Sequence, residues 1–237
     1  MSKVIAIFGA GPGLGASVAR RFAREGFRVA LVARRKDRLD ALVEQLTAEG
    51  IETVGFTADL SRPTEMPALI AGIHDHFGRI DVIEYGPISG EQSFSPATKL
   101  DAATLEKDSP LLLLTPVEAV RAVPPEWTGR GNGAFLIPTG HTAVEPQPHM
   151  RGVGPLMSAA RNWLYSLNGE LAQIGAYAGT LSVAAFIAGS EMGELAATAM
   201  PDTVGPLVDP DDLAAHYWDM YTKRDRVEQI RPQPQPD

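Results

Sequence analysis

The sequence predicts a single-domain α/β protein, with a doubly wound parallel sheet that carries helices on both faces. Its 237 residues suffice for one large hydrophobic core. Short apolar runs alternate with segments whose apolar residues recur at helical spacing, which is typical of a parallel sheet covered by crossover helices. The first apolar run ends in a glycine-dense turn at residues 9–15.

That turn is the most informative segment. Residues 4–8 (VIAIF) predict a strand, residues 9–15 read GAGPGLG, and Val18, Ala19, Phe22 and Ala23 then follow at helical spacing. Glycines let a ligand approach the backbone, and a helix N-terminus favours a phosphate. The alternative is a strand–helix turn without a ligand, although packing alone needs less glycine. The residues expected to bind a dinucleotide here are Gly9, Gly11, Gly13, Leu14 and Gly15.

The remaining elements follow in order. In the first half, strands are predicted at residues 27–33, 52–57 and 81–85, with helices around residues 39–46 and 69–77. In the second half, a helix at 111–123 is expected to stop at Pro124 and Pro125, and another helical stripe covers 153–171. Further strands are predicted at 133–137, 176–183 and, as an edge, 227–230, with a late helix at 211–221. Residues 190–210 lack strong periodicity.

Composition narrows the function. The net charge of −8 argues against a nucleic-acid partner, and the absence of cysteine excludes disulfides and thiolate metal sites. We expect no metal site. No apolar run approaches a membrane span, and the chain enters a strand without a signal peptide, so we expect a cytoplasmic protein. The domain is expected to cover residues 1–231, with a disordered tail at 232–237 (PQPQPD).

These motifs resemble the short-chain dehydrogenase/reductase family over nearly the whole chain. Phe8, Gly9, Gly13 and Gly15 match its Thr-Gly-x-x-x-Gly-x-Gly turn, and residues 77–82 match the lead into strand four. The resemblance implies a Rossmann-type fold and a nicotinamide cofactor. It also implies further cofactor contacts, from Asp59 with the adjacent Leu60 near the adenine and from the backbone of Ile187 at the nicotinamide carboxamide.

The residues after the second strand indicate which cofactor. An acid there would accept hydrogen bonds from the 2′-hydroxyl of NAD, whereas arginine accommodates the 2′-phosphate of NADP. The segment reads Ala33, Arg34, Arg35, Lys36, with no acid before Asp37. We therefore predict NADP(H), bound by Arg34 first and Arg35 second. The alternative is a solvated basic helix start.

The family's catalytic pattern is missing. The resemblance implies a tyrosine that donates a proton, a lysine four residues later and a serine about 13 positions before the tyrosine. Aligning the helix by residues 166–171 places Val153 at the tyrosine, Met157 at the lysine and Gly140 at the serine position. No tyrosine in the chain is followed four residues later by lysine. The sequence thus predicts an atypical member whose catalytic residues are unknown.

Several polar residues near the predicted strand ends are candidates for the missing role. They are Tyr85, His141, Thr139 and Thr142. Histidine titrates near neutral pH, and the threonines could bind a substrate carbonyl. The alternatives are a packed aromatic, a solvated histidine and turn-capping threonines. Arg161 could reach an anion or form a salt bridge, and Glu84 could be buried with a raised pKa or pair with an arginine.

The leading hypothesis is an atypical NADP(H)-binding oxidoreductase that acts on an unknown small molecule with a non-standard or absent proton donor. The alternatives are a non-redox isomerase, dehydratase or cyclase, and a catalytically inactive cofactor-binding or regulatory protein. The helices at 111–123 and 153–171 match the family's usual dimer interface. With Trp163 and Tyr165 as interface aromatics, we expect a homodimer or homotetramer.

Overall fold

Seven strands in the described part of the chain form one parallel sheet. In the computed structural model we describe residues 2–88, 96–146, 153–199 and 207–233. The sheet order is β3-β2-β1-β4-β5-β6-β7, and every neighbouring pair is parallel. The strands are β1 (Val4–Phe8), β2 (Arg28–Ala33), β3 (Thr53–Thr57), β4 (Val82–Tyr85), β5 (Gly133–Gly140), β6 (Ala176–Val183) and β7 (Glu228–Arg231).

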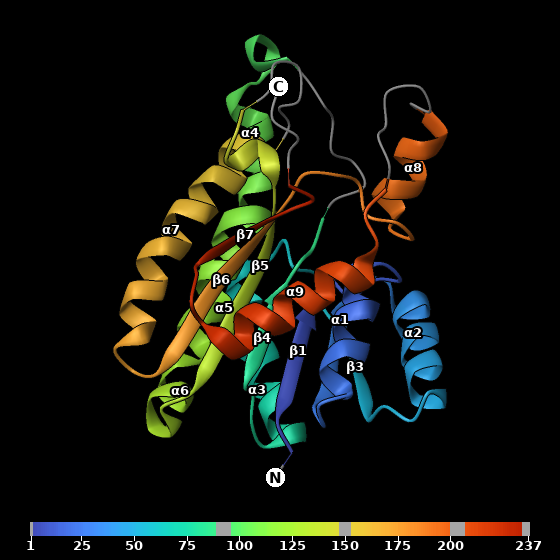
Figure 1. Cartoon of the computed structure of the whole chain (residues 1–237), viewed down its shortest axis with the longest axis vertical. Helices are drawn as coiled ribbons and strands as arrows, with labels where there is room; N and C mark the ends of the chain where they lie inside the picture. Colours follow the sequence, from blue (N-terminus) through green and yellow to red (C-terminus); the bar gives the residue numbers. More distant parts are fainter. Residues whose placement is uncertain (1, 89–95, 147–152, 200–206, 234–237) are drawn as a thin grey trace.

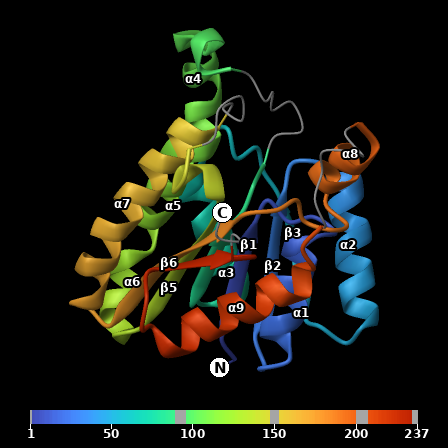
Figure 2. The same cartoon turned by 45° about the horizontal axis from the view of Figure 1, so that its top comes forward.

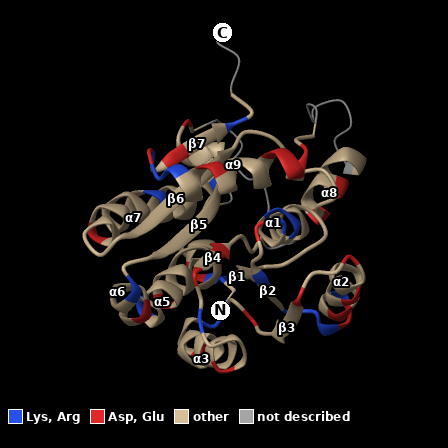
Figure 3. Cartoon of the chain, turned by 60° about the horizontal axis from the view of Figure 1, so that its bottom comes forward, with Lys and Arg blue, Asp and Glu red and all other residues tan. Residues whose placement is uncertain are grey.

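Helices cover both faces of the sheet, as predicted. Figure 3 shows α3, α5, α6 and α7 on one side and α1, α2 and α9 on the other. The longer helices are α1 (Leu14–Ala23), α2 (Lys36–Ala48), α3 (Met66–Phe77), α7 (Gly154–Ala172) and α9 (Pro210–Lys223). The shorter helices are α4 (Ala102–Ser109), α5 (Thr115–Ala122), α6 (Pro124–Arg130) and α8 (Glu191–Ala199), with a π-helical segment, η3 (Pro110–Leu114), and short turns η1 (Pro63–Glu65), η2 (Ala97–Lys99) and η4 (His141–Ala143).

The core has two halves because successive side chains of a strand point to opposite faces. In β1, Ala6 and Phe8 pack toward α3, α5 and α7, whereas Ile5 and Ile7 pack toward α1, α2 and α9. All of β1 is buried, as a central parallel strand requires. The carboxyl ends of all the strands lie at the same end of the sheet, and the glycine turn and the start of α8 lie there too (Figure 1).

The structure refines several details of the prediction. The expected helix at 111–123 is present, but it begins as the π-helical segment η3 and continues as α5, and α4 precedes it. Pro124 does not end the helical region but starts α6, because proline is tolerated in the first helical turn, where its missing N–H costs nothing. Strand β5 runs on to Gly140, and α8 forms in the stretch without strong periodicity.

The edge strand near residues 227–230 was predicted correctly, as β7. From residue 234 onward, the expected tail lies outside the described residues. Within the described part of the chain, no helix is long and apolar enough to cross a membrane, and no group of three or more acidic or histidine side chains could hold a metal ion.

Candidate functional site

The glycine turn lies where the sheet order reverses direction, between β1 and β4. In doubly wound sheets ligands bind beyond the carboxyl ends of the strands at such a point. Gly9 has a φ of 86°, and a Cβ there would lie 2.5 Å from the Cα of Pro87. The N–H groups of Gly9 and Ala10 both donate to the Val32 carbonyl at 2.9 Å. These constraints fix the path of the turn and require glycine at its start.

The N-terminus of α1 fits a phosphate. The N-cap residue of α1 is Gly13, so no side chain caps the helix, and its first turn contains no acidic residue. The first N–H groups of a helix lack intrahelical partners and attract anions. A Cβ at Gly11 would meet no atom within 4 Å, so this part of the turn is open to a ligand. Of the predicted residues in this turn, Gly11 is thus open to a ligand, whereas Gly9 lies against Pro87 and Gly13 against Ser190.

The two arginines predicted to choose the cofactor have different surroundings. Arg34 is exposed and makes no hydrogen bond or ion pair with any other described residue. Arg35 occupies the N-cap position of α2 without a capping side-chain bond, and it forms an ion pair with Glu191, which also pairs with Arg38. The Arg34 guanidinium is thus available to bind an anion, whereas the Arg35 guanidinium is already paired with the carboxylate of Glu191.

Asp59 and Leu60 follow β3, close to Arg34. Asp59 Oδ1 accepts hydrogen bonds from the amide and hydroxyl of Ser61, at 3.0 and 2.7 Å. These bonds lower the pKa of Asp59, and the charges of Arg62 and Arg34 lower it further, against the opposing effect of burial. The side chain of Leu60 is buried in the core, which leaves only its backbone for a ligand.

Ile187 lies beyond β6 and pairs with Val208. Its carbonyl accepts from the amide of Ser190 at 3.3 Å and from the hydroxyl of the same residue at 2.7 Å. The carbonyl is therefore occupied, and the N–H of Ile187 donates to none of the described residues. A contact from this backbone to a carboxamide would use the N–H.

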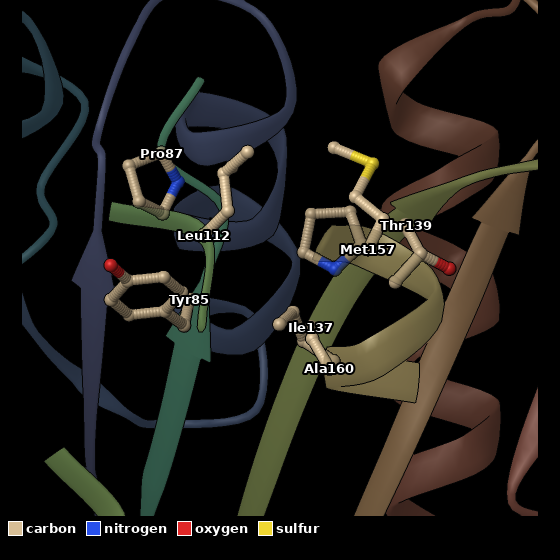
Figure 4. Close-up of a pocket in the computed structure, with 8 residues that line it drawn as sticks. Tyr85, Pro87, Leu112, Ile137, Thr139, Met157 and Ala160 are labelled. Atoms are coloured by element: carbon tan, nitrogen blue, oxygen red, sulfur yellow. The ribbon is translucent and has the colours of Figure 1, made fainter. Parts of the chain in front are cut away.

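A small pocket lies between the ends of β4 and β5, η3 and the start of α7 (Figure 4). Its volume is about 20 Å³, which is room for about one water molecule. The pocket is lined by Tyr85, Pro87, Leu112, Ile137, Pro138, Thr139, Met157 and Ala160.

Of the positions that the resemblance aligns with the family's catalytic residues, Met157 lines this pocket, whereas Val153 and Gly140 do not. Met157, in the first turn of α7, accepts a hydrogen bond from the N–H of Gly140 to its sulfur at 3.2 Å. Val153 is the N-cap of the same helix and is half-buried. Neither a valine nor a methionine side chain carries a proton that a substrate could take.

Tyr85 and Thr139 line the pocket, but their hydroxyls are engaged elsewhere. The buried Tyr85 hydroxyl donates to the Leu111 carbonyl at 2.6 Å and points away from Ile137 (Figure 4). Burial raises the pKa of this phenol, which disfavours its ionisation. The Thr139 hydroxyl lies 3.0 Å from that of Thr180 and 2.9 Å from that of Ser182. Tyr85 is therefore a buried aromatic whose ring lines the pocket.

His141 and Thr142 lie in η4, directly after β5. His141 Nε2 lies 3.2 Å from a carboxylate oxygen of Glu145. The other ring nitrogen, Nδ1, is buried without a partner among the described residues. The Thr142 hydroxyl lies beside Gly140 and Gly154, 3.5 and 3.7 Å from the position of a Cβ on each. Neither residue lines the pocket.

Glu84 and Arg161 have contrasting environments. Glu84 is buried on the α9 face, its Oε1 has no described hydrogen-bond partner, and burial raises its pKa to about 8. Arg161 donates from Nε to Glu228 at 2.8 Å, and Ser182 donates to the same carboxylate at 2.6 Å. The salt-bridge reading of Arg161 is confirmed, so this guanidinium is not free for a substrate.

Sequence reasoning missed Glu191 and Ser190. Glu191 lies 156 positions from Arg35 along the chain, and no local pattern connects them. A Cβ at Gly13 would lie 3.2 Å from the Cβ of Ser190, so Ser190 packs directly on the glycine turn. The sequence pattern did not reveal α8. Glu191 therefore could not be recognised as an acidic residue in the first turn of a helix.

Comparison with known proteins decides the family. Residues 3–175 match the family described as short chain dehydrogenase. The chain belongs to this family. A short chain dehydrogenase of Pseudocercospora fijiensis is 26% identical over 73% of this chain and 56% of its own length. A putative ketoacyl reductase of Streptomyces coelicolor is 35% identical over 35% of this chain and 31% of its own. The chain thus spans about half the length of the first of these curated relatives and about a third of the second.

Solved structures agree on the fold. An alcohol dehydrogenase from Thermococcus sibiricus, complexed with 5-hydroxy-NADP, superposes with a TM-score of 0.80 at 22% identity and 99% coverage of both chains. A 3-ketoacyl-(acyl-carrier-protein) reductase from Brucella melitensis, complexed with NADH, has a TM-score of 0.81 at 20% identity, covering 97% and 96%. At these identities the likeness establishes a short-chain dehydrogenase fold.

Proposed function

We propose that this short-chain dehydrogenase is an NADP(H)-binding oxidoreductase that acts on a small molecule with a non-standard or absent proton donor. The observation that carries the proposal is the combination of a glycine turn open at Gly11 with an exposed Arg34, directly after β2, that makes no hydrogen bond or ion pair with the described residues. A helix N-terminus and a free guanidinium are what a dinucleotide with an extra phosphate requires.

The residues that would hold the cofactor lie along one edge of the sheet. Gly11, Gly13, Leu14 and Gly15 would bind the diphosphate through backbone N–H groups. Arg34, with Arg35, would bind the 2′-phosphate. Asp59, the backbone of Leu60 and the N–H of Ile187 would bind the two ring systems. When bound, the cofactor supplies a hydride to the substrate or takes one from it.

The choice of NADP(H) over NAD(H) rests on the arginines. Relatives of this fold have been solved with either cofactor, so the fold alone does not decide. No acidic residue stands between Ala33 and Asp37 to accept the ribose hydroxyl of NAD. Arg34 supplies instead a planar donor that suits a phosphate.

The proton donor is the unusual part of the proposal. Val153 and Met157 stand where the family resemblance implies tyrosine and lysine, and the hydroxyls of Tyr85 and Thr139 are already bonded. His141 is the candidate that keeps a ring nitrogen without a described partner. A water molecule or the substrate itself are the other sources of a proton.

A second reading is a non-redox catalyst, such as an isomerase, dehydratase or cyclase. It is favoured by the mostly apolar lining of the pocket, which includes Leu112, Ile137 and Met157. A third is a catalytically inactive, cofactor-binding regulator. Product formation without a change in nicotinamide absorbance would favour the second reading. A protein partner whose binding changes with NADPH, without any turnover, would favour the third.

The direct test is hydride transfer. Purified protein with NADPH is mixed with panels of aldehydes, ketones, imines and activated alkenes, and nicotinamide absorbance and reduced product are both measured. The proposal expects stoichiometric loss of NADPH and appearance of reduced product in one panel. Tight NADPH binding without turnover in any panel would contradict the redox proposal and leave the other two.

We further propose that the protein is a homodimer or homotetramer. The helices α5 and α7 would form the interface, with the exposed Tyr165 among its residues. Trp163 is less suited than expected, because its ring packs edge-on to Phe135 at a centroid distance of 5.9 Å. Light scattering of the purified chain measures the oligomeric state.

A further inference from the structure

Glu191 holds the arginines that the proposed function needs for NADP(H). Its Oε1 accepts hydrogen bonds from Arg35 Nη2 and Arg38 Nη1, at the start of α2. Glu191 is the first residue of α8, and α8 lies beside the start of α2 in both views (Figures 1 and 2). A carboxylate therefore lies on the basic start of α2, next to Arg34.

The segment before Glu191 is fixed over the glycine turn. Ser190 packs on Gly13, its hydroxyl donates to the Ile187 carbonyl at 2.7 Å, and the N–H of Gly193 donates back to that hydroxyl at 3.0 Å. The start of α8 thus touches both places where the proposed cofactor would place its phosphates. These contacts join residues that are remote in the sequence and are independent of the ion pairs of Glu191.

A carboxylate and a phosphate monoester compete for the same guanidinium group, because both offer oxygens in a bidentate arrangement. A 2′-hydroxyl carries no charge and does not compete. We propose that Glu191 is a built-in competitor of the cofactor's 2′-phosphate: a 2′-phosphate displaces its carboxylate from Arg35 and Arg38, whereas a 2′-hydroxyl leaves it in place. The inference rests on the proposed function and adds a specificity-determining residue to it.

Replacing the Glu191 carboxylate by a 2′-phosphate on the arginines should cost little free energy. The side chains of Glu191 and Arg35 are 44% and 47% exposed, so water screens their attraction and the pair contributes little to stability. Arg34 makes no hydrogen bond or ion pair with the described residues and can meet the incoming phosphate first. The cost of displacing Glu191 then reduces the affinity for NADP(H) without affecting that for NAD(H).

The test compares Glu191→Gln with the unaltered protein. Dissociation constants are measured by calorimetry for NADPH, NADH, adenosine 2′,5′-bisphosphate and AMP. Glu191→Gln is expected to bind the two 2′-phosphorylated ligands about three- to tenfold more tightly, with NADH and AMP unchanged. The matched control is Glu194→Gln, since Glu194 is an exposed acid in the same first turn without a described ion pair.

A double-mutant cycle shows whether the effect passes through the arginines. In an Arg35→Ala/Arg38→Ala background, Glu191→Gln is expected to change NADPH affinity less than twofold. An equal gain in NADPH affinity in both backgrounds would overturn the inference. It would also be overturned if the unaltered protein prefers NADPH over NADH but Glu191→Gln leaves the NADPH affinity unchanged. If neither protein binds either dinucleotide, both the proposed function and the inference are wrong.

Discussion

The backbone N–H of Gly140, at the end of β5, donates a hydrogen bond to the sulfur of Met157, in the first turn of α7. The two residues lie 17 positions apart in the sequence, yet the fold places them in contact beside a pocket of about 20 Å³. A thioether is a weak acceptor and has no proton to give. The contact therefore packs this corner of the site without providing acid–base chemistry.

Restoring the family's pair should create a proton donor here. In Val153→Tyr/Met157→Lys the two new side chains stand four residues apart, one turn along the start of α7. We expect NADPH-dependent reduction of a small activated ketone to rise about 10- to 100-fold over the unaltered protein. The measurement is the initial rate of NADPH oxidation with product analysis.

The matched control is Val153→Phe/Met157→Lys, which keeps the ring and the amine but lacks the phenol hydroxyl. It should show no gain. A tyrosine variant that folds and binds NADPH but reduces nothing faster than this control would show that the two positions are not the catalytic ones.

Glu84 should make stability depend on pH. Its folded-state pKa, raised by burial to about 8, lies above the ordinary value of 4.5, so the folded protein keeps a proton that the unfolded chain releases. The stabilising contribution is complete below the unfolded pKa and is lost as pH rises through the folded pKa. Between pH 5 and pH 8 the free energy of unfolding should fall by about 3 kcal/mol from this group.

Glutamine matches the shape of the protonated acid and does not titrate. Urea denaturation of Glu84→Gln at the two pH values should therefore show a smaller fall than the unaltered protein. The control is Glu44→Gln, an exposed carboxylate on α2. An identical pH dependence for Glu84→Gln and the unaltered protein would mean that Glu84 is ionised throughout.

Asp81 should contribute strongly to the free energy of unfolding. It lies directly before β4, at the end of the sheet opposite the candidate site. Its buried carboxylate accepts from the Val4 amide and from Arg79 Nε, both at 2.8 Å. Asp81→Ala leaves both donors without that partner, and we expect a loss of about 3 kcal/mol in unfolding free energy. Asp40→Ala, which removes only an exposed pair with Lys36, should cost about 0.5 kcal/mol. Equal losses in thermal or urea unfolding would refute the distinction.

Most of the fold could be predicted from local sequence patterns. The glycine turn, the apolar strands and the helix over 153–171 follow from spacing that depends on near neighbours, and the structure reproduces them. Proline was harder to interpret. Pro124 can end one helix or begin the next, and the sequence does not say which, because the answer depends on how α6 packs Trp127 into the core.

The site was harder to predict because its decisive contacts are long-range. Thr139 looked like a substrate contact, yet its hydroxyl meets Ser182 on the neighbouring strand. The phenol of Tyr85 is bonded to Leu111, in a π-helical segment that the pattern could not show. The ion pair between Arg35 and Glu191 likewise depends on where α8 lies, not on either residue's neighbours.

The central claim is that the glycine turn and Arg34 bind NADP(H). It is tested most directly by titrating the unaltered protein, Arg34→Ala and the control Arg121→Ala with NADPH and NADH, following nicotinamide fluorescence. The account predicts that the unaltered protein prefers NADPH, that Arg34→Ala loses about 10- to 100-fold in NADPH affinity with NADH unchanged, and that Arg121→Ala changes neither. An equal loss for both dinucleotides in Arg34→Ala, or no binding of either by the unaltered protein, would contradict it.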